Sequence, residues 1–252
     1  MRIVVLSSGS KGNTTYMEFG KEKMLIDAGN NNKYITFKLE ELNVSLQDIN
    51  EILLTHTHID HTAGLKVLLK KTNAKVYLTK EMLADLPFIE NYQLIEDLTF
   101  KCGEVLVNAF KTSHDASSSL GYVITYENKK ITYVTDTGYI NSRYFELLKN
   151  SDLYIMESNH DVEKLMEGKY PFELKKRILS DKGHLSNTDA SKYLCEFLGN
   201  NTKYIFLAHL SEENNDPEIA LHTLEERLNK IDNKVEKIYI GKQNEMSEVI
   251  NL

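Results

Sequence analysis

The chain has 252 residues, enough to bury a sizeable core, and its composition of 41% hydrophobic and 27% charged residues is that of an ordinary soluble protein. The presence of only three prolines and the lack of a low-complexity tract argue against a disordered linker. No apolar stretch approaches the roughly 20 residues that span a bilayer, so we expect no membrane segment. The formal net charge of −7 argues against nucleic-acid binding by bulk electrostatics, although a metal centre can supply positive charge that this count omits.

The two cysteines, Cys102 and Cys195, stand alone and form no CxxC pattern. Isolated thiols fit a reducing compartment better than a disulfide framework. The apolar run at residues 3–6 is too short for the core of a signal peptide and is expected to form part of the first strand. We therefore expect a cytoplasmic protein.

The first half of the chain is rich in short runs of β-branched and aromatic residues bounded by Gly, Asn or Asp, which is typical of strands. These runs predict strands at residues 2–6, 14–19, 23–27, 51–55, 75–78, 104–111, 119–126 and 130–135. Helical patterns between them occupy residues 33–42, 61–71 and 80–85.

The second half is expected to alternate helices with strands. The helices are predicted at residues 143–149, 171–179, 187–198 and 216–230, and the strands at residues 152–156, 203–208 and 235–240. Ser186 is a good capping residue for the third of these helices. The whole order predicts one domain, residues 1–252, in which two sheets pack face to face with helices outside.

The segment His56-Thr57-His58-Ile59-Asp60-His61 follows the apolar run 52–54 and is the most informative part of the chain. On an extended chain alternate residues face the same way, so His56, His58 and Asp60 can converge on one centre. His61 leaves at another angle, where the sequence turns helical. Such a loop can present ligands to two adjacent metal ions.

Other polar residues stand where later apolar runs stop. Strand ends are common positions for a functional site because the scaffold is rigid and the loops are free to vary. The residues with metal-binding side chains at these ends are His114, Asp136, Glu157, His160 and His209. The sequence therefore holds enough ligands for a centre of two metal ions.

Two groups of ligands are expected. One ion would take His56, His58 and His114, with His160 as the alternative to His114. The other ion would take Asp60, His61 and His209, and Asp136 would bridge the two. Imidazole and carboxylate ligands suit Zn²⁺, with Mn²⁺ or Fe²⁺ as alternatives, and the paired ions could share an activated hydroxide.

This set of residues, in this order, resembles the metallo-β-lactamase fold superfamily over essentially the whole chain. The superfamily motifs are Leu25-Ile26-Asp27-Ala28-Gly29, the segment 56–61, His114, Asp136 and His209. Four further motifs resemble the YycJ/WalJ (VicX) group, which is regarded as a group of nucleases or phosphodiesterases: residues 7–13, 135–138, 157–161 and 183–187. The resemblance implies an α/β fold, the four-layer αββα sandwich, with the metals at one edge of the two sheets.

The resemblance also implies roles for single residues. Asp27 would be a structural aspartate behind the metal-ligand loop, or else a turn residue before Gly29. His184 resembles the histidine that ribonuclease Z-like phosphodiesterases place over the scissile phosphate, and it would be the general acid with Glu157 as its orienting partner. Asp60 would help to fix the metals and the hydroxide, and His160 would support the ligands or contact the substrate.

Two other segments have open interpretations. The turn Ser10-Lys11-Gly12-Asn13 could offer backbone N–H groups and Lys11 to a phosphate, or it could be an ordinary β-turn. Residues 169–182 carry five Lys and Arg against two acidic residues, a net charge of +3, which fits a nucleic-acid backbone or a solvated helix face. The chain has no room for the added domain of ribonuclease J-type nucleases, so substrate binding would fall to the core domain or to a homo-oligomer.

The first functional hypothesis is a metal-dependent phosphodiesterase, a nuclease with exonuclease character that acts on DNA rather than RNA. The alternative is a thioesterase of glyoxalase II type or a lactonase, which needs no phosphate-facing histidine at His184. A degenerate metal-binding module fits less well because the ligand set is intact. A flavodiiron-type redox centre is disfavoured by His58 and His61, which stand where that type alters the motif.

Overall fold

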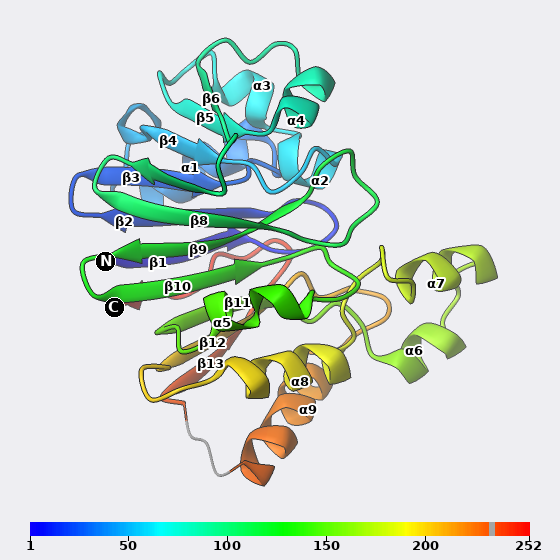
Figure 1. Cartoon of the computed structure of the whole chain (residues 1–252). Coiled ribbons are helices and arrows are strands. Elements are labelled where there is room, and N and C mark those ends of the chain that lie inside the picture. Colours follow the sequence, from blue (N-terminus) through cyan, green and yellow to red (C-terminus); the bar gives the residue numbers. More distant parts are fainter. Residues whose placement is uncertain (232–234) are drawn as a thin grey trace. The chain divides into compact units, whose positions relative to one another are not determined.

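The computed structural model describes residues 1–231 and 235–252, which divide into two compact units (Figure 1). Unit 1 comprises Met1–Ala109, Ala116–Leu120 and Lys242–Leu252. Unit 2 comprises Phe110–Asp115 and Gly121–Gly241. Each unit is built on a mixed β-sheet with helices beside it, and the single domain expected from the sequence stays a prediction.

The sheet of unit 1 has the order β14-β1-β2-β3-β4-β5-β6. Its strands are β1 (Arg2–Ser7), β2 (Thr14–Phe19), β3 (Glu22–Ile26), β4 (Glu51–Leu53), β5 (Lys75–Leu78), β6 (Tyr92–Leu94) and β14 (Ile250–Asn251). The first four strands in this order run antiparallel, and those from β3 to β6 run parallel. Ile26 pairs with Leu53, so β3 and β4 end side by side.

The helices of unit 1 are short. They are α1 (Asn32–Glu41), the 3₁₀ helix η1 (Leu46–Asp48), α2 (Ile59–Thr62), α3 (Leu65–Leu68) and α4 (Lys80–Asp85). The prediction of one helix over residues 61–71 is wrong, because the chain breaks into α2 and α3 at Gly64. The N–H of Gly64 donates to the carbonyl of Ala28 at 2.8 Å, and a Cβ there would lie 2.2 Å from the carbonyl oxygen of Asn30. This close approach prevents the helix from continuing.

The hairpin of β7 (Thr99–Cys102) and β8 (Val105–Lys111) follows, with Phe100 paired to Val107. The ring of Phe100 stacks on Tyr77 of β5, with centroids 5.3 Å apart. The division between the units falls within β8, because Ala109 belongs to unit 1 and Phe110 belongs to unit 2.

The sheet of unit 2 includes, in order, β13 (Lys237–Ile240), β12 (Tyr204–Ala208), β11 (Leu153–Glu157), β10 (Lys129–Val134) and β9 (Leu120–Tyr126). β9 and β10 form an antiparallel hairpin, and β10 to β13 run parallel. The carboxyl ends of parallel strands meet at one edge of a sheet, so the residues after β10, β11 and β12 are brought together there.

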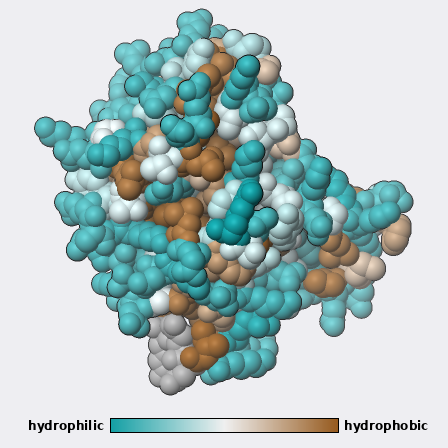
Figure 2. All heavy atoms as spheres, in the orientation of Figure 1, coloured by the Kyte–Doolittle hydropathy of each residue, from teal (hydrophilic) through white to brown (hydrophobic). Residues whose placement is uncertain are grey.

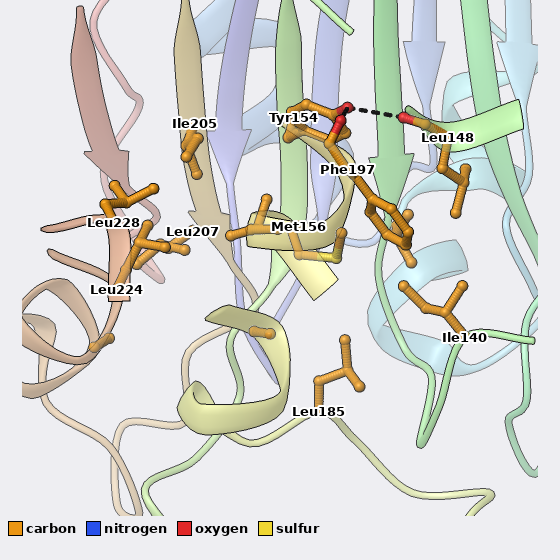
Figure 3. Packing of buried hydrophobic residues seen from close by; sticks show 14 of the residues in the cluster. Ile140, Leu148, Tyr154, Met156, Leu185, Phe197, Ile205, Leu207, Leu224 and Leu228 are labelled. Carbon is orange, nitrogen blue, oxygen red and sulfur yellow. Dashed lines mark hydrogen bonds between the residues drawn. The ribbon is translucent and has the colours of Figure 1, made fainter. Parts of the chain in front are cut away.

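The helices of unit 2 are η2 (Ser142–Tyr144), α5 (Phe145–Leu148), α6 (Val162–Glu167), α7 (Phe172–Ile178), α8 (Asn187–Phe197) and α9 (Pro217–Lys230). Helix α8 packs on α9 and β11 and closes an apolar core that contains Met156, Phe197 and Leu207 (Figure 3). Within this core the hydroxyl of Tyr154 lies 2.8 Å from the carbonyl oxygen of Leu148. The predicted cap of α8 is confirmed, because the Ser186 hydroxyl accepts a hydrogen bond from the N–H of Asp189.

Candidate metal centre

The loop after β4 and the short helix α2 of unit 1 together carry four of the predicted ligands. The ring centroid of His56 lies 4.6 Å from that of His58 and 4.1 Å from that of His61. The Oδ2 atom of Asp60 lies 3.5 Å from Nε2 of His61. His56 and His61 are buried, whereas His58 and Asp60 are partly exposed. This segment therefore concentrates imidazole and carboxylate groups as its spacing predicts.

Asp27, directly after β3, lies beneath this loop and is completely buried. Its carboxylate accepts hydrogen bonds from the N–H and the hydroxyl of Thr55, at 2.8 and 2.7 Å, and Nδ1 of His61 lies 2.7 Å from its Oδ2. Burial raises the pKa of Asp27, an effect that the charge of His61 and these hydrogen bonds oppose. Because the carboxylate accepts, His61 carries a proton on Nδ1, and when the ring is neutral its lone pair lies on Nε2.

Thr55 extends the network to a second histidine. Its hydroxyl hydrogen is donated to Asp27, so its oxygen is left to accept, and this oxygen lies 3.1 Å from Nδ1 of His56. His56 therefore also carries its proton on Nδ1. The sequence analysis missed Thr55, and the only signal was its position directly before His56 at the end of an apolar run.

Asn13 fixes the position of two predicted ligands in unit 1. Its Oδ1 accepts from the N–H of Gly9 at 2.8 Å and its Nδ2 donates to the Gly9 carbonyl at 3.0 Å, which sets the orientation of the amide. The same Nδ2 lies 3.3 Å from Oδ2 of Asp60 and 3.0 Å from Nε2 of His61. The side chain thus contacts two atoms that are predicted to bind metal.

The turn at residues 10–13 donates two of its backbone N–H groups to acceptors within unit 1. The N–H of Lys11 donates to Oε1 of Gln243 at 3.1 Å, and the N–H of Gly12 donates to the carbonyl of Gly9 at 3.0 Å. A phosphate contact predicted for this turn cannot come from these two N–H groups. Ser10 and Lys11 are exposed, and their predicted contact with substrate stays a prediction.

In unit 2 four residues converge at the carboxyl ends of the parallel strands and before α8. They are Asp136, Glu157, His184 and His209, and their ligand atoms lie within 4.8 Å of one another. The Oδ1 atom of Asp136 lies 3.3 Å from Nδ1 of His209 and 3.6 Å from Nδ1 of His184. Residues separated by up to 73 positions in the sequence are therefore neighbours in space.

Glu157 is the centre of this group and is completely buried. Its Oε1 lies 2.7 Å from Nδ1 of His184 and 2.9 Å from Nδ1 of His209, while Oε2 accepts from the N–H groups of Thr137 and Leu185 at 3.0 and 3.1 Å. Burial alone would raise the pKa of Glu157, but the charge of His184 and the hydrogen bonds from both imidazoles lower it to about 2. The group is therefore an ionised acceptor that holds two histidines.

His114 lies beside the same group. Its Nδ1 is 3.2 Å from the carbonyl oxygen of Gly183, and its Nε2 is 3.9 Å from Oδ1 of Asp136. Its ring centroid lies 5.1 Å from that of His184. The structure thus brings His114 to the predicted ligands of unit 2.

His160 does not belong to this cluster. It is buried, and among the described residues neither of its ring nitrogens has a hydrogen-bond partner. Burial lowers the pKa of His160 to about 4, although Glu157 opposes that effect. Its backbone carbonyl accepts from the N–H of Asn187 at 2.9 Å, which ties the loop to the start of α8. Its role as a substrate contact or as an alternative ligand stays a prediction.

Five histidines share one feature, because Nδ1 of each faces an acceptor atom of its own unit. They are His56, His61, His114, His184 and His209. For the four predicted ligands among them, His56, His61, His114 and His209, this tautomer of the neutral ring leaves Nε2 with the lone pair that a metal ligand uses. With the carboxylates of Asp60 and Asp136, the donor set fits divalent metal ions of the Zn²⁺, Mn²⁺ and Fe²⁺ type.

Three predicted site residues also have unusual backbone conformations. Asp27, Asp136 and His209 have φ of 59°, 54° and 55°, in the left-handed region that favours glycine. Each stands one or two residues after the end of a strand, β3, β10 or β12. Such a conformation costs about 1–3 kcal/mol per residue and is concentrated at functional sites.

The basic segment 169–182 contains α7. Figure 2 shows hydrophobic residues gathered over α6 and α7, at the right of the view. Two of its cations have partners: Nζ of Lys175 donates to the carbonyl of Met166 at 2.6 Å, and Nε of Arg177 lies 2.6 Å from Oδ2 of Asp115. Phe172 is exposed beside them. The segment is a solvated, mixed surface, and its contact with nucleic acid stays a prediction.

Comparisons with known proteins agree with this geometry. A family model described as a β-lactamase superfamily domain matches residues 22–206. The exodeoxyribonuclease WalJ of Streptococcus pneumoniae serotype 2 (strain D39 / NCTC 7466) is 40% identical over 239 residues, which cover 90% of this chain and 88% of that protein. The exodeoxyribonuclease YycJ of Bacillus anthracis is 36% identical over 223 residues, which cover 86% of this chain and 84% of that protein.

Among solved structures, the metallo-β-lactamase fold protein YhfI from Bacillus subtilis matches with a TM-score of 0.72 and 17% identity, covering 98% of this chain and 99% of that chain. At this identity the likeness shows the fold alone. None of the described helices has the length and apolarity that a membrane crossing requires.

Proposed function

Because the chain belongs to the metallo-β-lactamase superfamily and, within it, to the WalJ/YycJ group, we propose that it is a metal-dependent exodeoxyribonuclease. The membership confirms the resemblance seen in the sequence, and the two mixed sheets with flanking helices agree with the predicted fold class. Both curated relatives are named as exodeoxyribonucleases, which supports DNA as the substrate of this chain.

The observation that carries the proposal is the pairing of His184 with Glu157. The His184 side chain keeps 17% of its surface exposed, while its Nδ1 lies 2.7 Å from a completely buried carboxylate. With its Nδ1 turned to this carboxylate, His184 can present a proton on Nε2 to an oxygen leaving group, which is the role of a general acid. Asp136 and His209 lie next to this pair, so the acid stands beside the metal-type donors.

The chain's own residues then divide the work of phosphodiester hydrolysis. The oxygen of a water molecule forms a new bond to phosphorus, the bond to the 3′ or 5′ oxygen breaks, and the departing oxygen takes its proton from His184. The attacking water releases one proton to the solvent, and His184 regains a proton from the solvent before the next turnover. Glu157 touches no substrate atom in this scheme: it orients His184 and is a positioning residue. Divalent ions, when bound, supply Lewis acidity and an activated water.

We keep the ligand assignment predicted from the sequence as part of the proposal, with Zn²⁺ as the metal and Mn²⁺ or Fe²⁺ as alternatives. The imidazoles whose Nδ1 atoms face an acceptor and the carboxylates of Asp60 and Asp136 support it. A cytoplasmic location belongs to the same proposal, because both cysteines are free thiols and the proposed substrate is DNA. Assembly into a homo-oligomer stays a prediction.

The test uses the purified chain loaded with Zn²⁺ or Mn²⁺ and, in parallel, stripped with EDTA. End-labelled single- and double-stranded DNA, RNA of the same sequence and a thioester are the substrates. We expect stepwise release of nucleotides from DNA, lost with EDTA and restored by metal. Cleavage of RNA alone would replace the DNA assignment. Thioester hydrolysis without cleavage of any nucleic acid would overturn the proposal in favour of a carbon-ester hydrolase.

A further inference from the structure

A small polar pocket in unit 2 is used by none of the chemistry above. It has a volume of about 130 Å³ and is lined by Lys111, Thr112, Ser113, Tyr139, Asn141 and Arg143. Its walls come from the end of β8 with the residues that follow it, and from the loop after β10 with the start of η2. These two segments are tied together, because the N–H of Gly138 donates to the carbonyl of Ser113 at 2.9 Å and the N–H of Ser113 donates to the hydroxyl of Thr137 at 3.0 Å.

The pocket holds two cations that no carboxylate neutralises. Within the described part of the chain neither Lys111 nor Arg143 forms an ion pair, although the whole chain carries a net charge of −7. In an acidic protein most exposed cations have acidic groups nearby. Two that face one pocket without such a group form a local positive field.

Tyr144 holds this arrangement in place. Its hydroxyl accepts from Nη2 of Arg143 at 2.6 Å and from the backbone N–H of Lys111 at 3.3 Å. The guanidinium carbon of Arg143 also lies 4.6 Å from the centroid of the Tyr144 ring. One aromatic side chain therefore positions the guanidinium and the backbone of Lys111 together, and the remaining guanidinium donors stay available to a ligand.

The pocket is next to the candidate metal centre along the chain. Ser113 directly precedes His114, and Tyr139 stands three residues after Asp136. Two cations with three hydroxyls and an amide form a donor set that suits a tetrahedral oxyanion, because arginine and hydroxyl groups are strong donors to phosphate oxygens. A metal ion would be repelled by the two cations, and an apolar ligand would leave them desolvated.

We propose that this pocket binds a phosphate group of the DNA substrate other than the one that is cleaved. The inference rests on the proposed function for one point, that the bound molecule is a DNA strand. That the pocket binds a phosphate follows from its lining residues alone. A terminal phosphomonoester and an internal phosphodiester share the chemistry that the pocket recognises. The first carries a charge of about −1.5 to −2 at neutral pH. The arms of the experiment separate these two sources.

The experiment measures binding rather than cleavage. Fluorescent single-stranded oligonucleotides with a 5′ phosphate, with a 3′ phosphate, or with hydroxyls at both ends are titrated with the full, EDTA-treated chain over a range of salt concentrations. The variants are Lys111→Gln and Arg143→Gln, and Lys230→Gln, an exposed lysine of α9, is the matched control. Anisotropy gives Kd and its salt dependence for each.

We expect each pocket variant to raise Kd about tenfold and to reduce the slope of log Kd against log salt by about 1. An effect confined to one phosphorylated end assigns the pocket to a terminal phosphate, and an equal effect on all oligonucleotides assigns it to an internal one. Kd and slope that match Lys230→Gln in every arm would overturn the inference. If the wild-type chain binds with the expected slope but cuts no DNA, the phosphate pocket stands and the proposed nuclease activity fails.

Discussion

The Nδ1 atom of His61 lies 2.7 Å from Oδ2 of Asp27, and both side chains are completely buried. The same carboxylate accepts two hydrogen bonds from Thr55, whose hydroxyl oxygen reaches His56. One aspartate therefore fixes the tautomer of two imidazoles in the ligand loop. Groups behind a metal ligand orient the ligand and raise its basicity, so their loss is expected to weaken metal binding.

Replacement of Asp27 by Asn should lower the metal affinity of the chain about 10- to 100-fold, because the amide cannot offer His61 and Thr55 a charged acceptor. Competition with a fluorescent zinc chelator measures the affinity. The exposed residue Asp97 gives the matched control, Asp97→Asn, which should bind metal as the wild type does. An unchanged affinity in a folded Asp27→Asn chain would remove Asp27 from the metal centre.

His184→Ala and Glu157→Gln should differ in what they lose. His184→Ala should reduce DNA cleavage about 10²- to 10⁴-fold, the usual size of a general-acid contribution, with metal content unchanged. Glu157→Gln should reduce both cleavage and metal content, because the same carboxylate oxygen also holds His209. Mass spectrometry of the bound metal and an exonuclease assay give the two readouts. Loss of metal from His184→Ala would make His184 a ligand instead of an acid.

Stability should depend on pH through His160. The pKa of this buried imidazole is lowered from 6.5 to about 4, so the unfolded chain binds a proton more readily as the pH falls below 6.5. The free energy of unfolding should therefore decrease by about 2 kcal/mol from this group between about pH 7.5 and about pH 5, with no contribution above that range.

Urea unfolding of the metal-free wild type and of His160→Gln at the two pH values checks this expectation. The variant should lose less stability on acidification than the wild type. His222→Gln is the control, since His222 lies exposed in α9 and should leave the pH dependence unchanged. Parallel curves for the wild type and His160→Gln would contradict the prediction.

Tyr154→Phe should destabilise unit 2. The buried hydroxyl accepts from the N–H of Ser151 at 3.0 Å and lies 2.7 and 2.8 Å from the carbonyl oxygens of Phe197 and Leu148 (Figure 3). Its removal leaves buried backbone groups without a partner, at a cost of about 1–3 kcal/mol. Chemical denaturation measures the change, and Tyr92→Phe, at an exposed tyrosine, should have a negligible effect.

Most strands could be predicted from the sequence because their β-branched and aromatic runs are long enough to show a pattern. The predicted strand at 14–19 and the predicted helix at 80–85 match β2 and α4 in full. The missed elements η1, β6, β7, β14 and α6 are short, with three, three, four, two and six residues, so a periodic pattern has little length in which to appear. The helix at 61–71 was wrong because a contact between distant backbone segments, at Gly64, overrides local propensity.

The candidate site was predictable in its residue types and not in its connections. The six residues 56–61 are enough to predict the loop that carries the expected ligands. The hydrogen bond between His209 and Glu157 joins positions 52 apart, so no local pattern predicts it. Thr55 is an ordinary strand residue by composition. Its role depends on the register of β3 and β4, which brings Asp27 beneath it.

The left-handed backbone at Asp27, Asp136 and His209 bears on how this chain can change over generations. Glycine would relieve the backbone strain at each position. Variants selected only for stability would therefore tend to acquire glycine at these positions and lose the proposed activity. Directed evolution for higher stability should therefore keep these three residues unchanged, because it would otherwise select stable variants that lack activity.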